Sequence, residues 1–68
     1  MSEVLNFEGG FRVQLFRLGR YMEWRLFNAS GFLKGRGREL TKVKCERKWR
    51  TMLERLQESQ KQTKETKA

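Results

Sequence analysis

The stretch "FRVQLFRLGRYMEWRLF", residues 11–27, carries the pattern from which the fold can be predicted. Apolar and polar side chains alternate on both sides of Gly19-Arg20, and a period of two is typical of β-strands. A glycine at the first central position of a two-residue loop favours a type II′ turn. The stretch therefore predicts an antiparallel hairpin in which Leu15 lies opposite Trp24.

A third strand is expected after the turn signal "NASG", residues 28–31, in the segment "FLKGRGREL", residues 32–40. If 28–31 is the loop, Gly35 lies opposite Trp24, and Gly37 lies on the same core-facing side. Glycines at such positions leave room for an indole ring or for the close approach of a helix. The alternative interpretation is that they form a β-bulge or a flexible arm.

A helix is predicted from residue 41 to about residue 58, where the apolar period changes to 3.6. Thr41 is suited to cap its N-terminus. Residues 59–68 have no apolar anchor and are expected to form a disordered polar tail. The apolar stripe of the helix consists of Cys45, Trp49, Met52, Leu53 and Leu56.

The predicted fold belongs to the α+β class: a three-stranded antiparallel sheet packed against one C-terminal helix, in the order β-β-β-α. This domain spans residues 11–58, between a lead-in segment, residues 1–10, and the polar tail. The lead-in segment shows no clear period, so whether it adds a strand stays open.

Composition restricts the function more than the fold. The 68 residues contain 16 Lys and Arg against 8 acidic residues, all Glu, for a net charge of +8. Such a charge favours nucleic acid, an anionic surface or an acidic protein as partner. The chain has no His and no Asp, which removes most catalytic and zinc-binding combinations, so we expect no enzyme, no cofactor and no metal site. A single cysteine and no long apolar run predict a soluble protein of a reducing compartment, in the cytoplasm of a bacterium or an infected host cell, with association with the nucleoid as one option.

The sheet face away from the helix is the predicted binding surface. Its cations are interleaved with aromatic rings, a combination that nucleic-acid surfaces use for phosphates and bases. A second cationic stripe follows one edge of the helix and is expected to clamp the flanking backbone. The predicted contact residues are Arg12, Arg25, Lys34, Arg36, Arg38, Lys44, Lys48 and Arg55, and the predicted stacking or interface residues are Phe16, Tyr21, Phe27 and Phe32.

The predicted register also specifies cross-strand neighbours on this face. Glu23 would oppose Arg36 in an ion pair, and Tyr21 would face Arg38. Arg25 would oppose Lys34, and like charges in direct opposition are unfavourable unless an anion lies above them.

The pattern of residues 11–57 resembles two groups of small domains. A Gly-bearing third strand, a Thr cap and one packed helix are similar to the arm-site-binding domain of phage-type integrases and to the plant ethylene-response DNA-binding domain. That resemblance implies major-groove docking by Arg25, Lys34, Arg36 and Arg38, a role that Phe27 and Phe32 do not fit. The stretch "EWRLFNASG", residues 23–31, followed by a capped helix, is similar to the YegP-type small bacterial domain. The short basic chain also resembles small phage accessory proteins.

The sequence thus predicts a non-enzymatic nucleic-acid-binding protein, with DNA preferred to RNA. One alternative is an adaptor or inhibitor that binds an acidic host protein through the same face. Another is a homodimer with Phe16, Phe27 and Phe32 at its centre. A charge run can also be no more than a solvated surface, so the alternatives remain open here.

Overall fold

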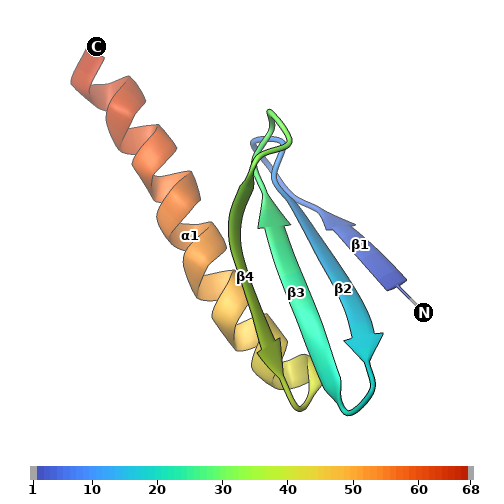
Figure 1. Ribbon diagram of the computed structural model, residues 1–68. Helices are drawn as coiled ribbons and strands as arrows, with labels where there is room; N and C mark the ends of the chain where they lie inside the picture. Colours follow the sequence, from blue (N-terminus) through green and yellow to red (C-terminus); the bar gives the residue numbers. More distant parts are fainter. Residues whose placement is uncertain (1, 68) are drawn as a thin grey trace.

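The computed structural model describes the backbone of residues 2–67 and the side chains of residues 2–59. It contains a four-stranded antiparallel sheet followed by one helix, so the α+β class and the C-terminal helix are confirmed and the prediction of three strands is wrong. Neighbouring strands in the sheet are also consecutive in the chain (Figure 1). The elements are β1 (Ser2–Asn6), β2 (Arg12–Leu18), β3 (Tyr21–Phe27), β4 (Leu33–Glu39) and α1 (Lys42–Lys67).

The fourth strand is β1, which forms within the lead-in segment. It pairs with β2 so that Leu5 lies opposite Val13 and Glu3 lies opposite Leu15. This register puts Glu3 on the core side of the strand, where a period of two predicts an apolar residue. The Glu3 carboxylate instead forms an ion pair of 2.9 Å with the ammonium group of Lys42 on α1. Because Glu3 occupies a core-side position, β1 lacks the alternation of apolar and polar residues by which a strand is predicted from sequence.

The β2–β3 hairpin has the predicted register, with Leu15 opposite Trp24. Gly19 has a φ of 62°, and among the described residues no non-glycine residue has a positive φ. A type II′ turn needs a positive φ at its first central position only, so this geometry agrees with the predicted turn at Gly19-Arg20.

The β3–β4 register differs from the prediction by two residues, because Trp24 lies opposite Gly37 rather than Gly35. The connection between the strands is residues 28–32, one residue longer than expected. The pairing then skips Lys34, the extra residue of a β-bulge. A shift of one residue would have moved both glycines to the other face, whereas two such shifts restore them to the core side.

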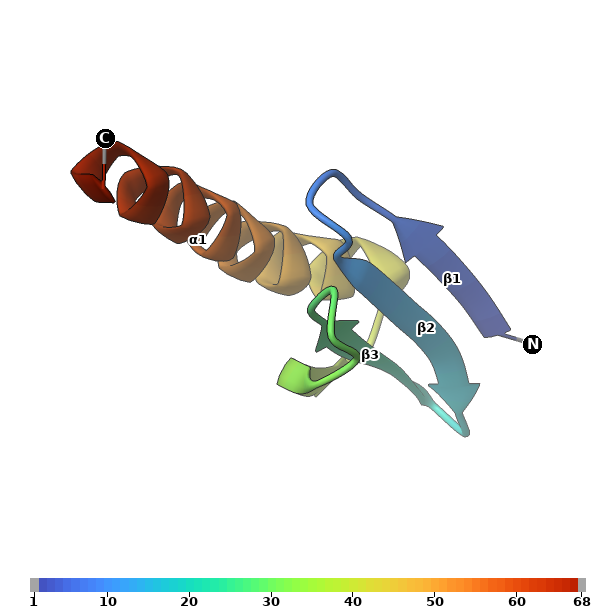
Figure 2. The same cartoon turned by 90° about the horizontal axis from the view of Figure 1, so that it is seen from above.

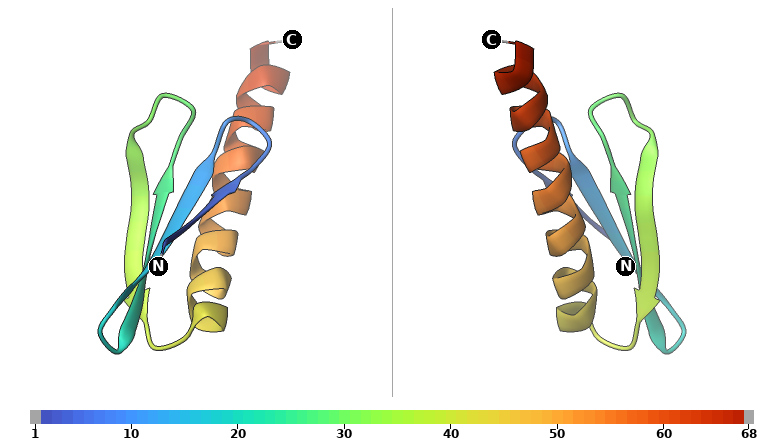
Figure 3. Two further views of the ribbon diagram at one scale, coloured as in Figure 1. Left: turned by 90° about the vertical axis from the view of Figure 1, so that its right-hand side faces the viewer. Right: turned by 90° about the vertical axis from the view of Figure 1, so that its left-hand side faces the viewer.

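Helix α1 covers the face of the sheet on which these glycines lie (Figure 3). A Cβ atom on Gly35 would overlap the Met52 thioether of α1, and one on Gly37 would lie 2.8 Å from Nε1 of Trp24. The interpretation of the glycines as space for packing is thus confirmed, and the bulge lies at the residue before them. The buried core consists of Phe11, Val13, Leu15, Trp24, Leu26, Cys45, Trp49 and Leu53.

The helix begins as predicted and ends later than predicted. The backbone N–H of Lys44 donates to Oγ1 of Thr41 at 3.2 Å, which confirms the cap. The predicted end near residue 58 is wrong, because α1 continues to Lys67 through most of the expected polar tail. No Gly or Pro follows Gly37, and Gln, Glu and Lys are good helix formers, so nothing local stops the helix. Residue 68 lies outside the described residues.

Candidate functional site

The face of the sheet opposite α1, called the open face below, is covered by no element of residues 2–67 (Figure 2). Its membership follows from the burial of every second strand residue in the core, since successive side chains point to opposite faces. The open face carries Ser2, Val4 and Asn6 on β1, Arg12, Gln14, Phe16 and Leu18 on β2, Tyr21, Glu23, Arg25 and Phe27 on β3, and Leu33, Arg36 and Arg38 on β4.

Glu23 lies at the centre of this face and is only 4% exposed. Its carboxylate accepts hydrogen bonds from Nε of Arg25 at 2.6 Å and from Nε of Arg38 at 3.0 Å. The hydrogen bonds from Arg38 and Arg25 lower the pKa of Glu23, so it is ionised at neutral pH. The predicted ion pair between Glu23 and Arg36 is wrong, because the shift in register makes Arg38 the cross-strand neighbour.

Arg25 and Arg36 lie directly opposite each other on β3 and β4. The predicted pairing of Arg25 with Lys34 is wrong, because the shift in register places Arg36 opposite Arg25 instead. The pair is still one of like charges. Arg25 is held by Glu23, and its guanidinium carbon lies 4.8 Å from the centre of the Phe16 ring. Arg36 is exposed and has no carboxylate partner in the described part of the chain. Arg25, Arg36 and Arg38 together with the one carboxylate of Glu23 thus leave a net positive charge on this part of the face.

The predicted aromatic residues do not form a single exposed surface. Phe16 is half-buried under Arg25, Phe27 is half-buried, and Tyr21 is 47% exposed. Arg38 lies opposite Glu23, so the predicted pairing of Tyr21 with Arg38 across β3 and β4 is wrong.

Phe32 and Lys34 lie at the end of β4 where the chain leaves the regular sheet. Phe32 is 68% exposed and belongs to the connection of residues 28–32. Lys34 is the extra residue of the bulge, outside the regular alternation of the strand. Phe32 therefore lies outside the strand, and Lys34 lies outside the regular pairing that places Arg36 and Arg38.

The cations of the helix lie on the other side of β4. Lys44, Lys48 and Arg55 are exposed on α1, as predicted. A shallow hollow of about 330 Å³ along this edge is lined by Lys48, Arg55 and neighbouring helix residues, including Met52, whose thioether approaches Gly35 of β4. The helix cations and the open-face arginines therefore flank the same edge strand without sharing a face.

A hollow of about 210 Å³ on the open face includes residues that the sequence did not single out. It is lined by Val4, Arg12, Gln14, Phe27 and Gly31. Arg12 and Phe27 were predicted as contact residues, whereas Val4, Gln14 and Gly31 were not. The period of two places Gln14 on this face, whereas the position of Val4 follows from the pairing of β1 with β2, which the sequence did not predict.

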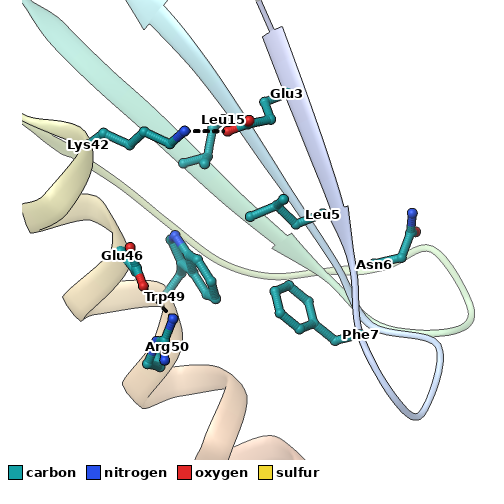
Figure 4. A pocket seen from close by; sticks show the side chains of 9 residues that line it. All are labelled: Glu3, Leu5, Asn6, Phe7, Leu15, Lys42, Glu46, Trp49 and Arg50. Atoms are coloured by element: carbon teal, nitrogen blue, oxygen red, sulfur yellow. Dashed lines mark hydrogen bonds and ion pairs between the residues drawn. The ribbon is translucent and has the colours of Figure 1, made fainter.

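A third hollow, of about 350 Å³, lies between β1 and α1 (Figure 4). Its walls are mainly apolar and include Leu5, Phe7 and Trp49. Ion pairs between Lys42 and Glu3 and between Arg50 and Glu46 border it. The two cations and two carboxylates balance, so this hollow lacks the charge excess that distinguishes the open face.

Within the described residues, no three His, Cys, Asp or Glu side chains lie close enough to hold a metal ion. None of the described helix is apolar over a length that could span a bilayer. Comparison of the chain with protein-family models, with curated proteins and with solved structures finds no match. The resemblances noted in the sequence therefore stay predictions.

Proposed function

We propose that this protein binds nucleic acid through the open face without catalysing a reaction. The observation that carries the proposal is the arginine cluster around Glu23. Arg25 and Arg38 donate to the Glu23 carboxylate, and Arg36 lies directly opposite Arg25 on the neighbouring strand. Such a pair is unfavourable in isolation, and a bound phosphate relieves the repulsion.

The hydrogen bonds of Glu23 support this role because they leave donors for a ligand. A guanidinium has five N–H groups, and Glu23 takes the Nε–H of Arg25 and of Arg38. The remaining N–H groups are the ones that form paired hydrogen bonds with phosphate oxygens. The buried carboxylate thus orients the two arginines before a ligand arrives, which reduces the entropy lost on binding.

The cations of α1 extend the positive field around the edge of β4. Lys44, Lys48 and Arg55 flank this edge strand from the helix layer, while Arg36 and Arg38 flank it from the open face. A nucleic-acid backbone that leaves the open face at β4 meets them next. We expect these three residues to contribute salt-dependent affinity without base specificity.

The test is fluorescence anisotropy with labelled DNA as the first substrate, single-stranded and duplex, followed by RNA, each at about 50 and 200 mM salt. The double variant Arg36→Gln/Arg38→Gln should weaken binding and reduce the slope of log K against log salt by about 1.4 to 1.8. Arg17→Gln/Arg20→Gln is the charge-matched control, because these exposed arginines lie at the β2–β3 turn. Circular dichroism checks that both variants fold.

Equal losses in the two double variants would show that net charge alone drives binding and would remove the open face as the site. No binding to any oligonucleotide at low salt would overturn the nucleic-acid proposal. An acidic protein partner that uses the same arginines would then be the next candidate.

A further inference from the structure

The hollow of about 210 Å³ on the open face has the composition of a base-binding site. It lies where β1, β2 and β3 meet the connection of residues 28–32, and its lining residues are given above. Its volume is below the roughly 300–1,000 Å³ of sites for drug-sized ligands, so it suits one flat group. The hollow is adjacent to the arginine cluster, because Gln14, which lines it, pairs directly with Arg25.

Three side chains in the hollow supply the chemistry that a nucleobase needs. Phe27 is half-buried and contributes an aromatic surface for stacking. Gln14, also half-buried, carries an amide with two donors and an acceptor, which can pair with a base edge. Arg12 is exposed, lies directly opposite Phe27 and contributes the cation for the adjoining phosphate.

The rim of the hollow is held in place by hydrogen bonds within residues 28–32. The side-chain Oδ1 of Asn28 accepts from the backbone N–H of Ser30 at 3.0 Å and of Phe32 at 2.9 Å. The backbone N–H of Gly31 donates to the Asn28 carbonyl at 2.9 Å. Gly31 has a φ of 87°, a conformation that glycine adopts without strain. The site is thus largely formed before a ligand binds.

We infer that this hollow holds one unstacked base of a single-stranded nucleic acid while Arg12 and the arginine cluster hold the neighbouring phosphates. The inference rests on the proposed function and specifies its substrate. Bases in a duplex are stacked and paired, so they cannot enter the hollow, whereas a single strand can turn one base out onto Phe27. Single-stranded substrates should therefore bind at least about tenfold more tightly than duplexes of equal length, the lower part of the range for one stacked base.

The test compares a labelled 12-nucleotide single strand, its duplex, and an abasic strand of the same length and charge, by anisotropy at fixed salt. The abasic strand keeps every phosphate and lacks the bases. We expect it to bind the unaltered protein about 5- to 150-fold more weakly than the normal strand, the range for one stacked base. Phe27→Leu should abolish this difference while leaving the affinity for the abasic strand unchanged.

Phe27 is half-buried, so its replacement can also affect folding, and a second variant tests the same site independently. Gln14→Leu keeps the side-chain length and removes the amide, and should reduce the preference among dA, dC, dG and dT homopolymers. Gln57→Leu is the matched control, because the Gln57 amide donates to the Glu8 carbonyl, 3.0 Å away on the helix side of the molecule, and should leave this preference intact.

Two failures can be distinguished. If normal, duplex and abasic strands bind equally, and Arg36→Gln/Arg38→Gln weakens all three, the base site is overturned and the proposed function survives. If no oligonucleotide binds the unaltered protein, the inference and the proposed function are both overturned.

Discussion

Gly37 of β4 lies directly opposite Trp24 of β3, and the indole ring occupies the space that a side chain at position 37 would need. A Cβ atom there would lie 2.8 Å from Nε1 of Trp24, closer than real contacts allow, and 3.0 Å from Cε2. The neighbouring Gly35 faces the flexible end of Met52 instead. Gly37 thus contacts a rigid ring, whereas Gly35 contacts a flexible side chain.

Gly37→Ala should therefore destabilise the protein more than Gly35→Ala. Trp24 is 4% exposed and packed on all sides, so overpacking it should cost about 1–3 kcal/mol. The Met52 side chain can rotate away from a new methyl group, and Ala also relieves the backbone entropy cost of Gly in a strand, so Gly35→Ala should cost less than about 1 kcal/mol. Urea denaturation of both variants measures the difference. Equal costs would mean that the Trp24 ring is free to move.

The ion pairs of Glu23 predict a dependence of stability on pH. Hydrogen bonds from Arg38 and Arg25 lower the pKa of Glu23 in the folded state. A lowered pKa adds stability above the ordinary Glu value of about 4.3, and this stability is lost as the pH falls through the folded-state pKa. Glu23→Gln should therefore lower the urea midpoint at pH 7, and the two proteins should converge in acid. A constant difference between pH 7 and pH 2 would contradict this assignment.

The thiol of Cys45 should be unreactive in the folded protein. Cys45 is fully buried beneath the sheet, its Sγ donates to the Met22 carbonyl at 3.3 Å, and burial raises the pKa of the thiol. The thiolate is the reactive form, and it is disfavoured in this environment. Labelling with a thiol reagent at pH 8 should therefore proceed at the rate of unfolding and become fast in urea. Rapid labelling of the native protein would show that α1 detaches from the sheet.

Thr41 at the N-cap and Thr51 within α1 form a matched pair for testing the helix cap. Thr41→Ala removes the acceptor for the Lys44 N–H and should cost about 1 kcal/mol. Thr51 donates to the Arg47 carbonyl within the helix, where Ala is the better helix former, so Thr51→Ala should be neutral or stabilising. Thermal unfolding followed by circular dichroism compares them. A loss at Thr51 as large as that at Thr41 would indicate a contact of Thr51 beyond the helix.

Local pattern was sufficient for the β2–β3 hairpin, the start of the helix and the two faces of β2 and β3. Leu15 and Trp24 face each other because the turn at Gly19-Arg20 sets their register and burial follows a period of two. The cap at Thr41 and the stripe that includes Cys45 follow from a period of 3.6 in the same way. These features depend on residues that are close in the chain, so they can be read from it directly.

The individual contacts of the candidate site required the three-dimensional arrangement. A longer connection and the bulge at Lys34 together move β4 by two residues, which assigns Arg38 to Glu23 and Arg36 to Arg25. Turn length and bulges respond to packing across the sheet, and the glycines beside Lys34 permit a bulge without specifying its position.

The remaining features depend on contacts between distant segments. An ion pair between Glu3 and Lys42 connects β1 to α1. The hollow at Gln14 exists because β1 lies beside β2. Sequence alone therefore established which residues of β2, β3 and α1 face the core and which residues carry the positive charge. The folded chain established which of those charges meet, because cross-strand register and the packing of the first strand depend on partners far along the chain.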